Sequence, residues 1–261
     1  MADMEPERHP KRARETQRLY AVIAQALGAK IAKGEYKVGE RLPSERDLAQ
    51  AHSVSRPTIR EAIIALEIDG LVEVRMGSGV YVTHKTPPSG ATGETDAGPF
   101  ELLEARRIIE GGICGLAAAR INQEQLDELA AVLDEMEKTL HHDVSLGEAA
   151  DRRFHLLIAE ATDNESLIGS VRSLWDARAR SPQYRHLSAK AHAAGVVPRM
   201  DEHRAILAAL TQRDPAAAQA AMQRHLSRVI ESLLTATEVE ELERARVQVD
   251  EQRRRYSVKR P

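Results

Sequence analysis

The 261-residue chain has a single cysteine, few aromatic residues and no long apolar run. The one cysteine, Cys114, excludes an internal disulfide and is typical of a reducing cytoplasm. Aromatic residues make up 3% of the chain, so the core must rely on Leu, Ile, Val and Ala, which favours helices. No apolar run approaches the ~20 residues that a membrane helix needs, and we recognise no signal peptide. We therefore expect a soluble cytoplasmic protein without a membrane partner.

The net charge of the chain is only −3, and this argues against a generally basic nucleic-acid-binding protein. The charge is unevenly distributed. Residues 1–85 contain 14 Lys and Arg against 12 Asp and Glu, and the remainder contains 23 against 28. A mildly basic N-terminal part on an acidic body fits a local contact with DNA. The length favours two domains, and 42% hydrophobic residues suffice for a core in each.

Changes in composition predict the domain organisation. We expect a flexible arm over residues 1–13, which either has no role or contacts phosphate through its basic residues. A first domain covers residues 14–84, and a linker rich in Pro, Gly and small polar residues covers 85–98. Helical periodicity then continues over residues 99–255 and predicts an antiparallel helical bundle, followed by a tail over 256–261.

Seven helices are predicted in the bundle, and the segment 183–197 is either a loop or a broken helix. Their expected ranges are 100–120, 122–142, 145–162, 164–180, 198–212, 215–237 and 238–254.

The stretch from Leu42 to Val82 has the pattern of a short helix, a turn, a second helix and a β-hairpin. Ser44 and Ser55 are suited to cap the two helices, and Gly70 to end the second. A further helix is expected before them, over residues 14–33. The hairpin is predicted as strands 71–75 and 80–83 with a glycine-rich tip.

Cationic and hydroxyl side chains at the start of the second helix are expected to point outward. Such a helix suits the major groove, where arginine pairs with guanine edges and hydroxyl groups contact phosphates. The hairpin tip suits a wing on the neighbouring groove or backbone. The alternative is a helical hairpin with ordinary solvated arginines. Taken together, the elements predict a winged helix–turn–helix that binds double-stranded DNA.

The segments GERLPSERDLA, VSRPTIREAI, LEIDGLVEVR and GSGVYV resemble the winged helix–turn–helix of the GntR family of bacterial transcription regulators. Met76 departs from relatives that carry a polar or basic residue at the wing tip. The resemblance implies that operator DNA is contacted by Arg46, Ser55, Arg56, Thr58, Arg60 and Gly77.

Four potential metal ligands lie on three predicted helices of the bundle. Asp151 and His155 are four residues apart, so they share one helix face. His203 and His225 lie on apolar-rich faces of two further helices. If the four converge, one carboxylate and three imidazoles suit zinc, nickel, manganese or iron. Each histidine alone is more often a hydrogen-bonded core or surface residue than a ligand, and spacing does not establish convergence.

The segments FHLLIAEATDN, DEHRAILAAL and DPAAAQAAMQRHL resemble the FCD domain that accompanies this DNA-binding domain in the FadR subfamily. That domain is an all-helical bundle. The resemblance implies a divalent metal, zinc first, held by Asp151, His155, His203 and His225. The expected fold is therefore mainly α, with an N-terminal winged helix–turn–helix and a C-terminal antiparallel helical bundle.

Arg106 shares a helical stripe with Leu102, Ile109 and Ile113, which aims its guanidinium inward. A buried arginine needs an anionic partner, either a protein carboxylate such as Glu110 or the carboxylate of an effector. The resemblance favours the effector. Arg107 is the second choice for this contact. Further polar and stacking contacts to a sugar-like ligand, or equally surface or core roles, are expected for Trp175, Arg178, Tyr184 and Arg185. Solvated loop positions are expected for His141, His142, His186 and His192.

These features together predict a metabolite-responsive transcription regulator that binds operator DNA as a homodimer. We expect a repressor that is released by a small organic or sugar acid bound beside the metal. The segment SLWDARARSPQY, together with the motifs of the N-terminal DNA-binding domain, is similar to regulators of hexuronate and sugar-acid catabolism. The alternatives are a metal-dependent enzyme, for which we find no general-base or nucleophile pattern, and an architectural DNA-binding protein without a ligand.

Overall fold

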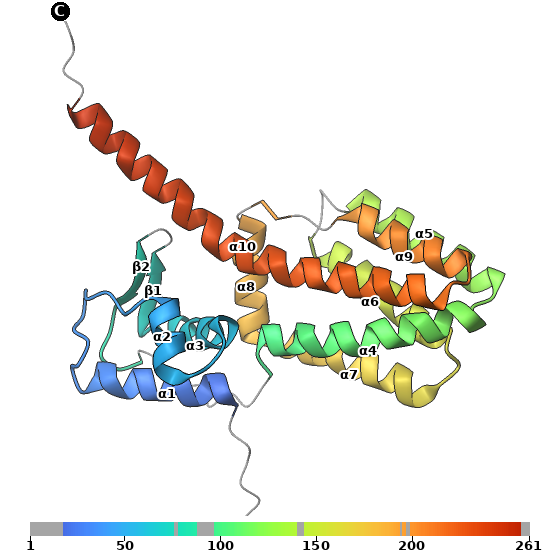
Figure 1. Ribbon diagram of the computed structural model, residues 1–261, viewed down its shortest axis with the longest axis horizontal. Helices are drawn as coiled ribbons and strands as arrows, with labels where there is room; N and C mark the ends of the chain where they lie inside the picture. The colour runs from blue at the N-terminus through green and yellow to red at the C-terminus, as the bar shows by residue number, and fades with distance from the viewer. Residues whose placement is uncertain are drawn as a thin grey trace, which may run out of the picture.

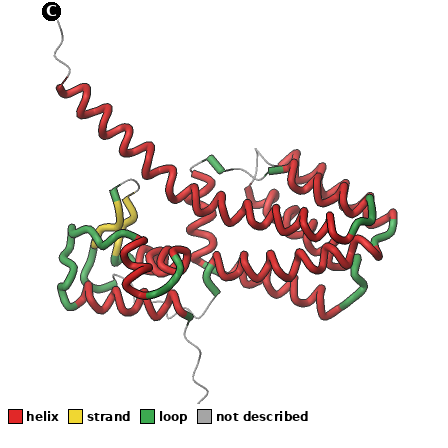
Figure 2. The backbone as a smooth tube through the Cα atoms, viewed as in Figure 1, coloured by secondary structure: helices red, strands yellow, loops and turns green. Residues whose placement is uncertain are grey.

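The computed structural model describes residues 18–75, 78–87, 97–139, 144–193, 195–196 and 199–256. In this part of the chain, ten helices and one two-stranded sheet form a small N-terminal head at one end of a longer helical bundle (Figure 1). Helix dominates both parts, and the strands are confined to the hairpin of the head (Figure 2). The predicted fold class, mainly α with a winged helix–turn–helix and a helical bundle, is confirmed.

The head consists of α1 (Leu19–Ala32), α2 (Glu45–His52), α3 (Arg56–Ile68), β1 (Val72–Arg75) and β2 (Gly79–Val82). Its core is aliphatic and is formed by α1, α3 and the hairpin, with Leu27, Ile31 and Ile59 fully buried. The two predicted caps are confirmed, because the Ser44 hydroxyl accepts the Asp47 N–H and the Ser55 hydroxyl accepts the Thr58 N–H. This core holds α3 along most of its length and leaves Arg56 at its N-terminal end exposed.

Gly70 ends α3 as predicted, and Gly34 ends α1 in the same way, since their φ angles are positive, at 71° and 79°. β1 and β2 pair antiparallel, with Val72 opposite Val82 and Arg75 opposite Gly79. The first four residues predicted for α1, 14–17, and the wing-tip residues 76–77 lie outside the described residues.

In the part of the bundle that the structure describes there are seven helices, and the last of them packs along most of the length of the first. Leu103, Leu129, Phe154 and Ile158 are among the fully buried side chains of its main core. The helices are α4 (Pro99–Arg120), α5 (Gln123–Thr139), α6 (Val144–Glu160), α7 (Glu165–Arg180), α8 (Pro182–Ala193), α9 (Met200–Thr211) and α10 (Pro215–Tyr256). In the described residues, no helix is apolar and long enough to cross a membrane.

Two predictions for the bundle need correction. The segment left open as loop or broken helix forms α8 over most of its length. The break predicted between residues 237 and 238 is wrong, because both segments belong to the single helix α10. Neither Pro nor Gly occurs after Pro215 in this helix, so nothing in its sequence interrupts the backbone hydrogen bonds. In Figure 1, α10 runs on beyond the bundle and past the head.

Helix α3 joins the head to the bundle through its acidic side chains. The buried Glu61 carboxylate accepts the N–H groups of Phe100 (2.9 Å) and Glu101 (3.2 Å), and so supplies the cap that the N-terminus of α4 lacks in its own Gly98. Glu67 accepts hydrogen bonds from Lys190 Nζ (2.7 Å) and His186 Nε2 (2.9 Å) of α8. The prediction of His186 as a solvated loop residue is therefore wrong.

Candidate metal centre, effector cavity and DNA-binding face

Asp151, His155, His203 and His225 come together inside the bundle. One ligand atom of each lies within 4.8 Å of the others, and all three histidines are buried. Asp151 and His155 are one turn apart on α6, while α9 and α10 supply one imidazole each. The convergence that spacing left open is thus present, because α9 and α10 pack against each other and turn their imidazoles toward the face of α6 that carries Asp151 and His155.

Each imidazole has an outer partner for its Nδ1 atom. His225 Nδ1 donates to Glu202 Oε2 at 3.1 Å, His203 Nδ1 lies 3.4 Å from the carbonyl oxygen of Arg199, and His155 Nδ1 lies 2.5 Å from Glu110 Oε2. The Nε2 atoms are left for the centre of the cluster. Two of them approach Asp151 Oδ1, at 3.0 Å for His203 and 3.5 Å for His155. Outer carboxylates and carbonyls of this kind orient metal-binding imidazoles.

Electrostatics keep the Asp151 carboxylate ionised. Burial alone would raise the pKa of Asp151, but the hydrogen bond with His203, the contact with His155 and the charge of both imidazoles hold it well below its ordinary value. Burial would lower the pKa of His155, yet the nearby charges of Glu110 and Asp151 raise it. Burial, together with the nearby His203 and His155, lowers the pKa of His225 to about 4, so its imidazole is neutral at pH 7.

The cluster fits a divalent metal ion. Both ring nitrogens of His155 are buried, and neither meets hydrogen-bond geometry within the described residues, so Nε2, which faces the cluster, needs a partner. Three imidazole nitrogens and one carboxylate oxygen match the donors that zinc and its first-row neighbours prefer. A bound cation would take the lone pairs of the three Nε2 atoms and one Asp151 oxygen, and its open positions would polarise an anionic ligand.

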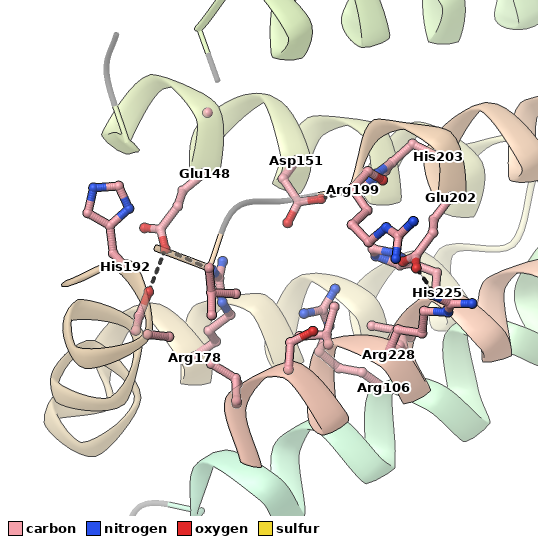
Figure 3. Close-up of a pocket in the computed structure, with 18 of the residues that line it drawn as sticks. Arg106, Glu148, Asp151, Arg178, His192, Arg199, Glu202, His203, His225 and Arg228 are labelled. Carbon is pink, nitrogen blue, oxygen red and sulfur yellow. Dashed lines mark hydrogen bonds and ion pairs between the residues drawn. The ribbon is translucent and has the colours of Figure 1, made fainter. Parts of the chain in front are cut away.

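A cavity of about 190 Å³ opens onto this cluster (Figure 3). Asp151, His203 and His225 line one side of it, and the guanidinium groups of Arg106 and Arg178 line another. Cationic and metal-ligating groups therefore face one enclosed space, which suits a small anion. Several further residues that line the cavity were not predicted from the sequence, namely Glu148, Ser188, Arg199, Glu202 and Arg228. Glu148 and Arg228 are each three residues from a predicted ligand on the same helix, so helical spacing alone could have identified them.

Only some of the residues predicted to bind the effector line the cavity. Arg106 is 3% exposed and binds Glu110, with 2.7 Å between Nε and Oε1, so the protein carboxylate considered for it is present. Tyr184 lines the cavity under Arg178, whose Cζ lies 4.6 Å from its ring centre. Trp175 lies behind both arginines, with Cζ atoms 4.0 and 4.8 Å from its ring. It is not among the described lining residues.

Other predicted positions lie elsewhere. Arg107 faces a separate groove of about 650 Å³ between the head and the bundle, away from the metal-type cluster. Arg185 is exposed and donates to the carbonyl oxygens of Ala179 and Arg180. His192 is at the end of α8, not in a loop, and lines the cavity. His141 and His142 lie outside the described residues.

On the head, α2 and the start of α3 present four of the predicted DNA-contacting residues. The Arg46 side chain is 85% exposed and that of Arg56 is 56% exposed. The Ser55 and Thr58 hydroxyls bond each other at 2.7 Å beside them. Cationic and hydroxyl groups thus share the N-terminal end of α3. Gly77, predicted for the wing contact, lies outside the described residues.

Arg60 does not point outward, and the prediction that it does is wrong. Arg60 is 5% exposed, and its guanidinium makes two hydrogen bonds to the Glu45 carboxylate, at 3.0 and 2.7 Å. A third hydrogen bond reaches the carbonyl oxygen of Leu234 on α10, at 3.1 Å. Helix periodicity places Arg60 near the face of Arg56, but it cannot show that α2 and α10 cover this position.

A winged helix beside a helical bundle that contains a cavity lined by arginines and potential metal ligands is the arrangement of a ligand-responsive DNA-binding regulator. Residues 19–82 match the family of bacterial regulatory proteins called gntR, and residues 101–228 match the FCD domain. The chain belongs to the GntR family, in the group that carries an FCD domain. It is a metabolite-responsive transcription regulator and not an enzyme.

Relatives of known role agree with this assignment. The chain is 38% identical to the Uxu operon transcriptional regulator of Escherichia coli (strain K12), covering 89% of this chain and 93% of that protein. It is 37% identical to the Exu regulon transcriptional regulator of the same organism, covering 81% and 83%. The HTH-type transcriptional regulator LutR of Bacillus subtilis (strain 168) is 35% identical, covering 76% and 94%. GntR regulators bind operator DNA, FCD domains bind small effectors, and some FCD domains bind metals.

Proposed function

We propose that this regulator is a homodimeric repressor that a hexuronate or related sugar acid releases from its operator. The acid binds in the bundle beside a divalent metal, zinc first, held by Asp151, His155, His203 and His225. One observation carries the proposal: the same cavity of about 190 Å³ is lined by potential metal ligands and by the guanidinium of Arg106. A carboxylate placed between a cation and a guanidinium gains charge-assisted bonds from both.

The far side of the cavity supports an acid that also carries hydroxyl groups. Glu148 Oε1 accepts a hydrogen bond from Arg178 Nη2 at 2.9 Å, and Ser188 Oγ lies 3.5 Å from the same oxygen. His192 and Tyr184 lie on this side as well. These groups offer both donors and acceptors, which hydroxyls satisfy and an alkyl chain does not. The relatives named as Uxu operon and Exu regulon regulators support the same class of effector.

Helix α8 offers a route from the cavity to the DNA-binding head. Tyr184 and Ser188 line the cavity, while His186 and Lys190 of the same helix bind Glu67 of α3. Glu67 also accepts the N–H of Val74 in the wing strand β1, at 3.1 Å. A ligand that moves α8 therefore shifts a carboxylate shared by the recognition helix and the wing, and this would change how the two heads of a dimer are spaced.

Operator contacts are proposed for the exposed side chains at the start of α3 and on α2. Arg56 would read base edges, while Arg46, Ser55 and Thr58 would hold the phosphate backbone. Gly77 of the wing would approach the backbone closely.

A ligand screen on zinc-loaded protein tests the proposal. Glucuronate, galacturonate and fructuronate should raise the thermal midpoint and release operator DNA in a gel-shift assay, while lactate and decanoate should have much weaker effects. Chelation of the metal should remove the response. Arg106→Ala should abolish release while leaving DNA binding intact, and Arg107→Ala, its neighbour outside the cavity, should respond like the wild type. Equal responses of the two variants would contradict the proposed site.

A further inference from the structure

Glu110 is a buried carboxylate of α4 that contacts two functional groups of the site at once. The residue is 2% exposed. Its Oε1 accepts from Arg106 Nε at 2.7 Å, and its Oε2 lies 2.5 Å from His155 Nδ1. A second contact from Arg106 Nη2 to Oε2 measures 3.4 Å. One group that would ligate the metal and one that would bind the effector's carboxylate therefore share a single anion behind the cavity.

The contact with His155 decides which ring nitrogen faces the cluster as a lone pair. A carboxylate only accepts hydrogen bonds, so at 2.5 Å the nitrogen beside it carries the proton, although this contact does not meet hydrogen-bond angles. A proton on Nδ1 leaves Nε2 available as a metal ligand, and Nε2 is the nitrogen on the Asp151 side of the ring. With the proton on Nε2, the same ring could not coordinate.

The contact with Arg106 holds the guanidinium against the ring of Trp175, at 4.0 Å between Cζ and the ring centre. Nε and one Nη2 hydrogen are directed at Glu110. The remaining donors of the planar group are left for the cavity that Arg106 lines. Within the described residues, Glu110 is the group that the Arg106 guanidinium hydrogen-bonds, so it sets which donors remain for the cavity.

We propose that Glu110 is a positioning residue that holds the proton on His155 Nδ1 and aims Arg106 into the cavity. Metal affinity and anion recognition then depend on one carboxylate that touches neither the metal nor the effector. The inference rests on the proposed function, because His155 and Arg106 belong to the proposed site.

Glu110→Gln separates the two contacts, because an amide has one accepting and one donating end. If its oxygen accepts from Arg106, its NH2 group meets His155 Nδ1 and drives the proton to Nε2. If its oxygen meets His155, its NH2 group faces the donors of Arg106 and displaces the guanidinium. In either orientation one of the two side chains loses its arrangement, although the volume of the side chain is unchanged.

The first measurement uses metal-free protein labelled with ¹⁵N-histidine, and reads which ring nitrogen carries the proton by long-range NMR correlation. The signals of His155 are assigned by their loss in His155→Gln. We expect a proton on Nδ1 in the wild type and in Glu104→Gln, an exposed control on the same helix. Wild-type Nδ1 without a proton overturns the inference, whether or not any Glu110 variant folds.

The second measurement compares zinc affinity, by competition with a chromophoric chelator, and the emission of Trp175, the one tryptophan of the chain. Glu110→Gln should lose about 10- to 100-fold in zinc affinity or change the Trp175 emission, with a circular dichroism spectrum like that of the wild type. Glu104→Gln should change neither. Zinc affinity and emission both unchanged in Glu110→Gln overturn the inference. No zinc binding by the wild type instead refutes the proposed metal site, and leaves the NMR result to decide the role of Glu110.

Discussion

Two arginines of α3, one turn apart, differ sharply in their surroundings. The Arg56 side chain is 56% exposed and lies 4.0 Å from Glu45, while the Arg60 side chain is 6% exposed and binds the same carboxylate at 2.7 Å. Glu45 therefore pairs closely with the buried arginine and only loosely with the exposed one. Arg56 stays at the surface with a side chain that can reach a base edge, whereas Arg60 ties α3 to α2 and α10.

The two positions should respond differently to truncation. Arg56→Ala should weaken operator binding by roughly 1–3 kcal/mol and leave the thermal midpoint nearly unchanged. Arg60→Ala should instead lower the free energy of unfolding by roughly 1–3 kcal/mol, because it leaves Glu45 and a carbonyl oxygen without their donor. Fluorescence anisotropy with operator DNA and thermal unfolding measure the two effects.

Arg180→Ala, at an exposed arginine of α7, is the charge-matched control for both measurements. An Arg56→Ala protein with wild-type operator affinity would remove Arg56 from the proposed contact surface.

At the scale of elements, α3 is held to the bundle by Glu61 at the N-terminus of α4. Burial raises the pKa of Glu61 to about 7, although the N–H groups of Glu101 and Phe100 lower it in part. Because the folded-state pKa lies above the ordinary value of 4.5, this residue's contribution to stability is complete below about pH 4.5 and is lost as the pH rises through 7.

Glu61→Gln should therefore flatten the dependence of stability on pH. The amide oxygen can still accept the two N–H groups but does not ionise. Between pH 5 and pH 8 the wild type should lose on the order of 2–3 kcal/mol relative to the variant, measured by denaturant unfolding at each pH. Parallel stability curves for the two proteins would show that Glu61 does not titrate in this range.

Helix α8 should transmit the effector signal through Glu67. Lys190→Ala removes the 2.7 Å ion pair without touching a residue that lines the cavity. Without effector, the operator affinity of the variant should stay within about threefold of the wild type. The hexuronate concentration needed for release should rise at least about tenfold, which corresponds to a loss of about 1.4 kcal/mol in coupling free energy. Arg185→Ala, exposed on the same helix, is the control. Wild-type release by Lys190→Ala would exclude this route.

At the scale of the whole molecule, the proposed dimer places two winged helices on one duplex. Two half-sites must then lie on the same face of the DNA. Insertion of five base pairs between them turns one half-site to the opposite face, and should reduce affinity to near that of a single half-site. Insertion of ten should restore part of it. Gel-shift titration measures both, and equal affinity for all three spacings would indicate that each head binds independently.

The sequence alone determined the helices, their caps and the identity of both parts of this protein. Ser44, Ser55 and Gly70 act within a few residues of their own positions, so local rules were sufficient for them. The four candidate metal ligands were recognisable because Asp151 and His155 share a helix turn and the motifs around all four resemble the FCD domain. Local rules failed for the segment that forms α8, which has no strong amphipathic pattern, and for the supposed break in α10.

Only the tertiary structure decided the partners of the charged side chains. Arg60 meets a residue 15 positions away and another 174 positions away, and Glu67 meets α8 more than 100 positions later. Helix packing also decided that His203 and His225 meet the ligands on α6, and that Arg107 lies outside the cavity. It likewise placed Glu110 in contact with both Arg106 and His155. Helix periodicity fixes the direction in which a side chain leaves its own helix, but the group that it meets depends on how distant helices pack.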